Sequence, residues 1–346
     1  MRTSILVIGL CGLAGCASPP GKPSSNPEFA RALAPVFSVD MPEALERMAA
    51  LTPATLDASQ RRTRECMIDR FGQDAAPSKD GALAAPVEAV LQAYRRYWTT
   101  ALMQRASLEG AETALSADLA KLLGAPASGI EAQTEEAVHT AEKYGLHALG
   151  GVTAPLHEFM LWRQQTTQRE TIALVDGTVD IQVTLLDGFV SLGWAAWGTC
   201  ERSHTGGWAT SDGIMVVAPA WKLDSEDYLV SLQAHEAQHF SDYRIYPKLA
   251  SPDLEYRAKL VELALANQTQ RALLEQFTAG AKRDRTLPHS FANYWVVEHL
   301  RMRLKTTSWD AVTTAAVRNA ATAALAAHSA ALDARGRDTV ATALPD

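Results

Sequence analysis

Two histidines and a glutamate stand close together in the segment His235-Glu236-Ala237-Gln238-His239. Residues four positions apart lie one turn above each other on a helix, so both imidazoles can reach one ion about 2.0 to 2.1 Å from their ring nitrogens. Glu236 projects from an adjacent position and can hold a water molecule without itself binding the metal. The spacing therefore predicts Zn²⁺ as cofactor, His235 and His239 as ligands, and Glu236 as the catalytic general base.

The sequence around this motif favours a helix with a defined beginning. Ser225 fits an N-cap, and two acidic residues follow it in what would be the first turn. Leu232 and Tyr243 share one helical stripe with both histidines, so we expect the imidazoles to point toward the core. A strand is predicted over 213–218, just before this helix, where it could pair with an extended peptide.

A catalytic zinc site also needs a third protein ligand and an open position. The metzincin pattern would require Gly and His where this chain has Asp242 and Ile245, which excludes that family, and an aspartate ligand at position 245 is disfavoured in the same way. The segment instead resembles the gluzincin metallopeptidases, whose third ligand is a glutamate on a following helix. This resemblance implies Glu255, which begins a Glu-Tyr-Arg-Ala run similar to the glutamate helix of some gluzincins. Glu262, two turns later on the same face, is the alternative ligand.

The resemblance covers residues 225–260 and departs from the family pattern at two points. Fifteen residues separate His239 from Glu255, fewer than in thermolysin-like members. Lys259 stands where many members have an aspartate that orients a ligand histidine. Asp242 is the candidate substitute for that aspartate, and an ion pair with a cation on the helix surface is the alternative account of it.

Acyl transfer at such a site would need a second donor for the oxyanion that develops during the reaction. Related enzymes supply a His or Tyr, and the candidates here are His289, Tyr294 and His299 downstream, and His204 upstream. The sequence therefore predicts a zinc-dependent hydrolase, in the first place a metallopeptidase with peptide or protein substrates. Two alternatives stay open. One is a zinc hydrolase of a non-peptide bond, and the other is a non-catalytic envelope lipoprotein with a structural metal site or a helical partner-binding role.

The first residues have the anatomy of an export signal. Arg2 precedes an apolar run over 5–15, which is too short to cross a bilayer as a helix and ends in Leu-Ala-Gly-Cys. This ending resembles the lipobox of bacterial lipoproteins, in which cleavage precedes the cysteine and acyl chains are attached to it. The resemblance implies a signal peptide over 1–15, lipidation of Cys16 and anchoring to a membrane. Ala17 after the cysteine favours the outer membrane, with the protein facing the periplasm.

The rest of the 346-residue chain is long enough for one large or two modest domains. Pro, Ser and Gly dominate residues 16–27, which are predicted to form a flexible tether. Residues 28–150 show helical periodicity, whereas residues 151–346 combine a small sheet with further helices. The predicted fold class is α+β and predominantly helical, with a helical N-terminal portion followed by a zincin-like domain that contains the metal-binding helix.

Hydrophobic periodicity and turn residues give the expected elements. A β-hairpin is expected over 170–185, because branched residues flank the Asp176-Gly177 turn. An aromatic stripe of Tyr94, Tyr97 and Trp98 is expected in the core. Helices are expected over 42–51, 55–71, 86–106, 116–123, 129–144, 225–246, 252–279, 290–305 and 308–334.

Composition and cysteine count narrow the class of protein further. Apolar residues make up 47% of the chain and charged residues 21%, as in ordinary globular proteins. A net charge of −7 gives no attraction for phosphate backbones, so nucleic acid is not an expected partner. Cys11 would be lost with the signal peptide, which leaves Cys66 and Cys200 as a candidate disulfide in an oxidising periplasm. Two separate buried thiols are the alternative.

Overall fold

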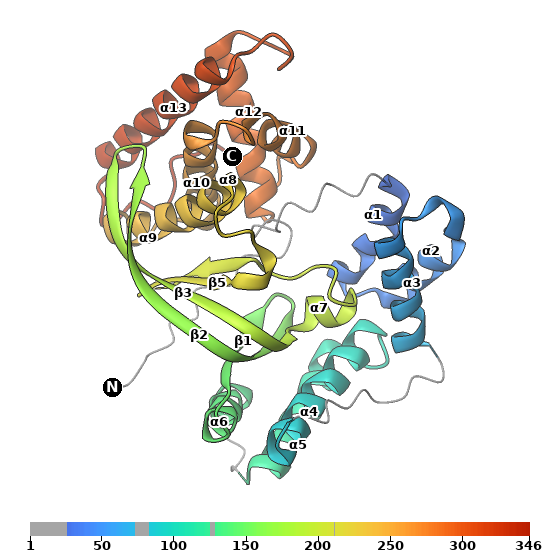
Figure 1. Cartoon of the computed structure of the whole chain (residues 1–346). Coiled ribbons are helices and arrows are strands. Elements are labelled where there is room, and N and C mark those ends of the chain that lie inside the picture. Colours follow the sequence, from blue (N-terminus) through green and yellow to red (C-terminus); the bar gives the residue numbers. More distant parts are fainter. Residues whose placement is uncertain (1–25, 73–82, 125–128, 211) are drawn as a thin grey trace. The chain divides into compact units, whose positions relative to one another are not determined.

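The computed structural model describes residues 26–72, 83–124, 129–210 and 212–346 (Figure 1). The predicted signal peptide, the predicted lipidation site at Cys16 and the predicted tether up to residue 25 lie outside the described residues. None of the described helices has the length and apolar character needed to cross a membrane. The described residues form a predominantly helical α+β fold, as the sequence predicted.

The chain divides into two compact units. The first contains the described residues up to Gln165 together with Leu186–Thr205, and the second contains Thr166–Leu185 together with Gly206–Asp346. A single boundary near residue 150 was expected. The division differs from it because the two long strands β2 (Leu156–Leu174) and β3 (Gly177–Leu192) each contribute residues to both units.

The first unit is built mainly from helices whose ends are fixed by local capping. Asp57 caps α3 by accepting the Gln60 N–H, while the Gln60 side chain accepts the Asp57 N–H. Tyr94, Tyr97 and Trp98 are at most 3% exposed, which confirms the expected aromatic core. The helices are α1 (Pro27–Leu33), α2 (Met41–Ala50), α3 (Ala58–Phe71), α4 (Ala85–Leu102), α5 (Leu108–Leu123), α6 (Ile130–Lys143) and α7 (Trp194–Gly198).

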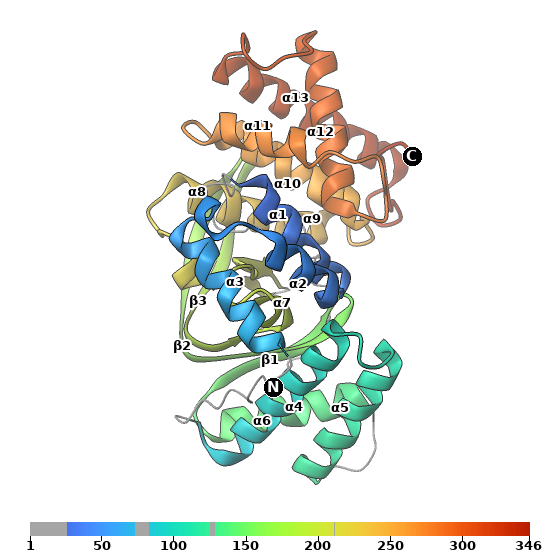
Figure 2. The ribbon, with the colours of Figure 1, turned by 90° about the vertical axis from the view of Figure 1, so that its right-hand side faces the viewer.

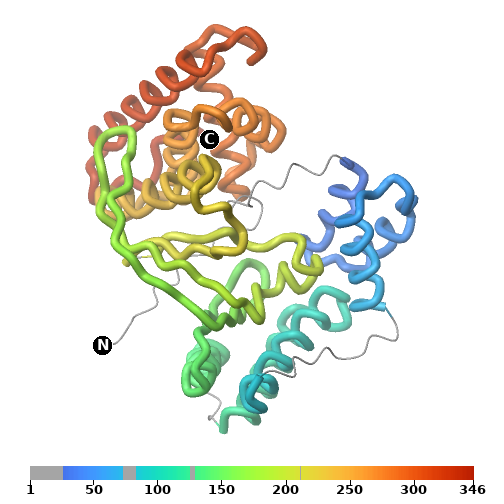
Figure 3. The backbone as a smooth tube through the Cα atoms, in the orientation of Figure 1, coloured from blue at the N-terminus to red at the C-terminus, as the bar shows by residue number. Residues whose placement is uncertain are grey.

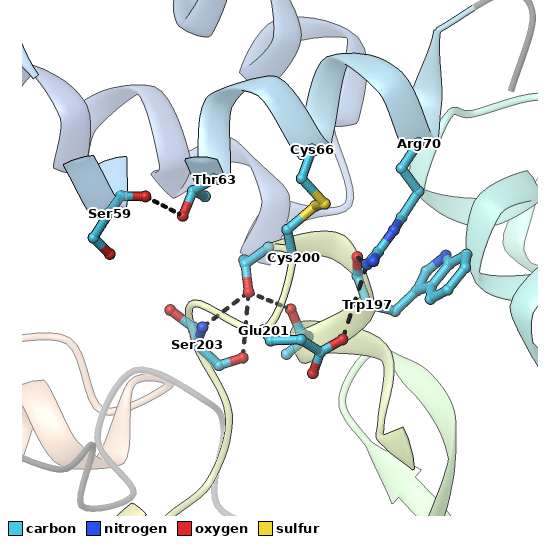
Figure 4. The surroundings of a disulfide bond; sticks show 10 residues. Ser59, Thr63, Cys66, Arg70, Trp197, Cys200, Glu201 and Ser203 are labelled. Carbon is cyan, nitrogen blue, oxygen red and sulfur yellow. Dashed lines mark hydrogen bonds and ion pairs between the residues drawn. A yellow bond between two sulfur atoms is a disulfide. The ribbon is translucent and has the colours of Figure 1, made fainter. Parts of the chain in front are cut away.

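A disulfide joins α3 to the residues after α7, all within the first unit. Cys66 and Cys200 are bonded with an S–S distance of 2.03 Å across a sequence separation of 134 residues, as predicted (Figure 4). Arg70, one turn after Cys66, donates to the Trp197 carbonyl at 2.6 Å, and its guanidinium lies 4.2 Å from the centre of the Trp197 ring. The bridge and this cation–π contact hold the two elements together at neighbouring points.

The sheet has five strands in the order β1-β2-β3-β5-β4. β1 (His147–Thr153) pairs antiparallel with β2, and β4 (Gly207–Ala209) pairs antiparallel with β5 (Gly213–Val217). The expected hairpin forms around the Asp176-Gly177 turn, although its strands are far longer than predicted. The strand predicted at 213–218 is present, but it lies between two neighbours. The short β4, not β5, is therefore the end strand.

The second unit is organised around one buried helix. In α10 (Ser251–Leu265), every residue from Pro252 to Ala264 is buried, and the helix contacts α9, α11, α12 and α13 (Figure 2). The expected helix over 252–279 is split after Leu265, because the Glu226 carboxylate accepts the backbone N–H groups of residues 267–269. The other helices are α8 (Glu226–Tyr228), α9 (His235–Ile245), α11 (Gln270–Ala279), α12 (Pro288–Leu304) and α13 (Thr314–Arg335).

The C-terminal segment closes onto the beginning of α10. The buried Asp253 carboxylate accepts hydrogen bonds from Thr342 Oγ1 at 2.6 Å, from the Ala343 N–H at 2.7 Å and from the Leu344 N–H at 3.1 Å. His328 Nε2 of α13 lies 3.1 Å from the same carboxylate. These contacts satisfy a carboxylate that is fully buried, which fixes the first turn of α10.

Candidate metal centre

The helix that carries both histidines begins after an unusual turn. Residues Leu229–Ala234 form a π-helical turn that leads directly into α9, a feature the sequence did not predict. Ser225 caps the preceding turn by accepting the Tyr228 N–H at 3.2 Å, as expected. Gln233, inside the π turn, donates to Glu170 Oε2 at 2.6 Å. π-Helical turns occur frequently at functional sites, and this one directly precedes His235.

Three buried side chains converge where α9 meets α10. These two consecutive helices lie side by side in the backbone trace (Figure 3). His235, His239 and Glu255 each offer one ligand atom, and these atoms lie within 4.8 Å of one another. His239 Nε2 is 3.1 Å from His235 Nε2 and 3.2 Å from Glu255 Oε1. The three residues are at most 5% exposed. The structure therefore brings together the three residues expected from the sequence, and this group could hold a metal ion.

Two of the separations between these atoms are close to those around a tetrahedral ion. A tetrahedron with corners about 2.0 to 2.1 Å from its centre has edges of about 3.3 to 3.4 Å. The nitrogen–nitrogen distance of 3.1 Å and the nitrogen–oxygen distance of 3.2 Å are close to such edges. Three atoms with lone pairs that face one another in a buried space need a cation or protons between them. Two imidazoles and one carboxylate make a donor set suited to zinc.

Glu262, the alternative third ligand, approaches the opposite side of His235. Its Oε1 lies 2.7 Å from His235 Nδ1, whereas Nε2 of the same ring lies 3.6 Å from Glu255 Oε2. Glu262 is 4% exposed and sits two turns after Glu255 on the same face of α10. In this arrangement Glu255 occupies the ligand position and Glu262 contacts the outer nitrogen of a ligand.

Glu236 lies beside the three ligands and is held by the sheet. Its Oε2 accepts the N–H of Ala209, in the end strand β4, at 3.0 Å. Burial raises the pKa of Glu236 above its usual value, and the hydrogen bond from the Ala209 N–H partly opposes that rise. A carboxyl group with a raised pKa, held next to a metal site, is suited to taking up and returning a proton.

An imidazole and an ammonium group face the second oxygen of Glu255. His289 Nδ1, at the start of α12, lies 2.7 Å from Glu255 Oε2, and Lys259 Nζ lies 4.0 Å from it. The Lys259 ammonium also lies 4.7 Å from the centre of the Phe277 ring. Burial alone would raise the pKa of Glu255, but the charge of His289 and the hydrogen bond and charge of His239 outweigh it and hold that pKa well below its usual value. Glu255 is therefore a carboxylate.

Asp242 does not orient a ligand histidine, which was the role predicted for it. It is fully buried, accepts Gln238 Nε2 at 2.8 Å and Arg257 Nε at 2.9 Å, and has no described contact with a ligand histidine. The alternative of a surface ion pair is wrong as well, because the partner is the buried Arg257 of α10. The sequence predicted an ion pair for Asp242, but the cation comes from α10 and not from the helix that carries Asp242.

Of the four candidates for a second donor, only His289 has a described contact with one of the three ligand residues. The Tyr294 ring packs edge-on against Trp295, with centroids 5.1 Å apart. His299 Nδ1 lies 2.7 Å from the Tyr256 hydroxyl. His204 belongs to the first unit, where its Nδ1 lies 2.9 Å from the Thr205 carbonyl.

Comparisons with family models, with curated proteins and with solved structures find no match for this chain. The character of the site therefore rests on its own residues. These are two histidines from one helix, a glutamate from the next, and a buried glutamate beside them.

Proposed function

We propose that this protein is a zinc-dependent hydrolase, most simply a metallopeptidase, with a zincin-like second unit. One observation carries the proposal: the ligand atoms of His235, His239 and Glu255 converge within 4.8 Å, next to the buried carboxyl of Glu236. Magnesium and calcium prefer sites made of oxygen ligands alone, so two imidazoles favour zinc over either. A purely structural zinc site would not need the adjacent carboxyl group, whereas hydrolysis does.

Each group at the site has its own role in the proposed hydrolysis. Bound zinc would lower the pKa of a water molecule toward neutrality and polarise the carbonyl group to be attacked. Glu236 takes the proton of the attacking water and returns it to the leaving amine. The Ala209 N–H holds Oε2 of Glu236, so the carboxyl group stays oriented while its other oxygen exchanges the proton. His289 Nδ1 lies 2.7 Å from Glu255 Oε2 and can orient that carboxylate toward a cation.

The position of β4 supports a peptide substrate. β4 is an end strand of the sheet, and Ala209 within it holds the general base. An end strand can pair with an extended peptide through its backbone, which would place the peptide next to Glu236. Together with the lipobox-like sequence ending at Cys16, this gives a lipid-anchored envelope peptidase whose substrates are peptides or proteins in the periplasm.

Zinc content and one substitution test this proposal. Purified native protein is expected to contain zinc by elemental analysis and to cleave a mixed peptide library. Glu236→Gln should retain the zinc and lose about 10² to 10⁴-fold in rate, because the proton acceptor is gone. The matched control is Glu46→Gln, an exposed carboxyl on α2 of the first unit. Native protein without zinc, or full activity in Glu236→Gln, would refute the proposal. Bound zinc without hydrolysis would favour a non-catalytic lipoprotein.

A further inference from the structure

We propose that Glu262 is a positioning residue for the metal ligand His235, and that its carboxylate raises the affinity of the site for a divalent cation. The inference rests on the proposed metal site and adds a residue to it that binds no metal. In this proposal two glutamates of α10 have different roles. Glu255 binds the ion, and Glu262 contacts Nδ1 of the ligand His235.

The contact between the two side chains is short and shielded from water. Glu262 Oε1 lies 2.7 Å from His235 Nδ1, within the range of a charge-assisted hydrogen bond. The side chains of Glu262 and His235 are each 5% exposed. Solvent therefore screens this interaction little, and the ring has few alternative partners for Nδ1.

The acceptor character of a carboxylate fixes the tautomer of His235. A neutral imidazole carries one N–H, and an ionised carboxylate can only accept a hydrogen bond. The proton therefore lies on Nδ1, and the lone pair lies on Nε2, which faces His239 Nε2 at 3.1 Å. The opposite tautomer would bring a nitrogen lone pair against Oε1 at 2.7 Å and would remove the lone pair from the metal side.

The position of Glu262 also explains how the chain does without the expected aspartate. Lys259 occupies that position, and an ammonium group cannot accept a hydrogen bond. Its Nζ lies 4.0 Å from Glu255 Oε2 instead. Glu262 is three residues further along α10 and so projects from nearly the same face. The acceptor for His235 thus comes from the next turn of the helix.

Zinc affinity of the full chain tests this role independently of hydrolysis. Competition with a chromophoric chelator gives the dissociation constant for zinc. Glu262→Gln keeps an oxygen acceptor but loses the charge, and Glu262→Ala loses both. Affinity is expected to fall in the order wild type, Gln, Ala, with a total loss of about 10- to 100-fold. The visible absorption of bound Co²⁺ should also change, because the ligand ring reorients. Glu275→Gln is the control, since this carboxylate is exposed on α11 and pairs with Arg271.

The outcomes separate this inference from the proposed function. A zinc dissociation constant within about twofold of wild type in both Glu262 variants, with an unchanged cobalt spectrum, would overturn the positioning role while the metal site stands. Failure of the wild-type chain to bind either zinc or cobalt would overturn the site and this proposal together. If Glu262→Ala does not fold, the near-isosteric Gln variant decides the question by itself.

Discussion

The guanidinium of Arg257 and the carboxylate of Asp242 form a buried ion pair that joins α10 to α9, with Nε donating to Oδ2 at 2.9 Å. Gln238 occupies the other oxygen of the carboxylate at 2.8 Å. Asp242 follows His239 by three residues, and Arg257 follows Glu255 by two. The pair therefore links the helix that carries the histidines to the helix that carries the glutamate, close to both.

Removal of one partner of this pair should be costly. Arg257→Leu leaves Asp242 buried without its cation, and we expect the free energy of unfolding to fall by about 3 to 5 kcal/mol. Urea denaturation measures the loss. Arg337→Leu is the control, because its ion pair with Asp333 is exposed and its removal should leave stability close to that of wild type. Equal losses of unfolding free energy in the two variants would show that the buried ion pair contributes no more to stability than the exposed one.

Lys259 should weaken metal binding in the wild-type protein. Its ammonium lies 4.0 Å from a ligand carboxylate, so it repels any cation held there. Lys259→Met keeps the packing against Phe277 and removes the charge, which should tighten zinc binding by up to about tenfold. Chelator competition is the measurement. Weaker binding in the Met variant would mean that the ammonium supports the site.

The disulfide should stabilise the first unit and leave metal binding unchanged. It closes a sequence separation of 134 residues, and removing a native disulfide typically costs about 2 to 5 kcal/mol. The double variant Cys66→Ser, Cys200→Ser should therefore unfold at a lower temperature by calorimetry, while its zinc dissociation constant stays that of wild type, since all three ligands lie in the second unit. A large change in zinc affinity would contradict this separation.

Glu158 should make stability depend on pH. Burial raises its pKa well above the usual 4.5, although it accepts the Trp194 N–H and a hydrogen bond from Thr153. A raised pKa means that the folded state binds the proton more tightly, so this contribution is complete below about pH 4.5 and is lost as the pH rises through the folded-state pKa. Glu158→Gln does not ionise, so this variant should not lose stability in that way as the pH rises.

Thermal unfolding at two pH values tests this sign. The stability of Glu158→Gln relative to wild type should increase from about pH 5 to about pH 8. The exposed Glu46→Gln should show no such trend. A difference between Glu158→Gln and wild type that is constant with pH would mean that Glu158 has the same pKa in the folded and unfolded states.

The pair of histidines could be predicted from local geometry, and Glu255 from its place near the start of the next helix together with the resemblance to the gluzincins. His235 and His239 are one turn apart, and Glu255 lies near the start of the next helix. The partners of Asp242 and Glu262 could not be predicted in this way. Each depends on how α9 is rotated against α10, and the unpredicted π turn at Leu229–Ala234 lies directly before α9.

The length of β2 and the end of α10 could not be predicted from the sequence either. Residues 163–169 of β2 are polar and exposed, so they lack the alternation of apolar and polar residues that indicates a strand. The break after Leu265 is fixed by Glu226, a residue 41 to 43 positions away in the sequence. The helix break has no strong signal in its own neighbourhood, because hydrogen bonds to a residue far away in the sequence determine it.

Residues 342–344 pack over Asp253, so they support the part of α10 that carries Glu255. Asp253 precedes Glu255 by two residues and depends on Thr342, Ala343 and Leu344 for three of its hydrogen bonds. Truncation before residue 342, or a fusion that pulls these residues away, would leave a buried anion short of donors at the base of the glutamate helix. Such a change would loosen Glu255, the candidate third ligand, while all three candidate ligand residues stayed in the sequence.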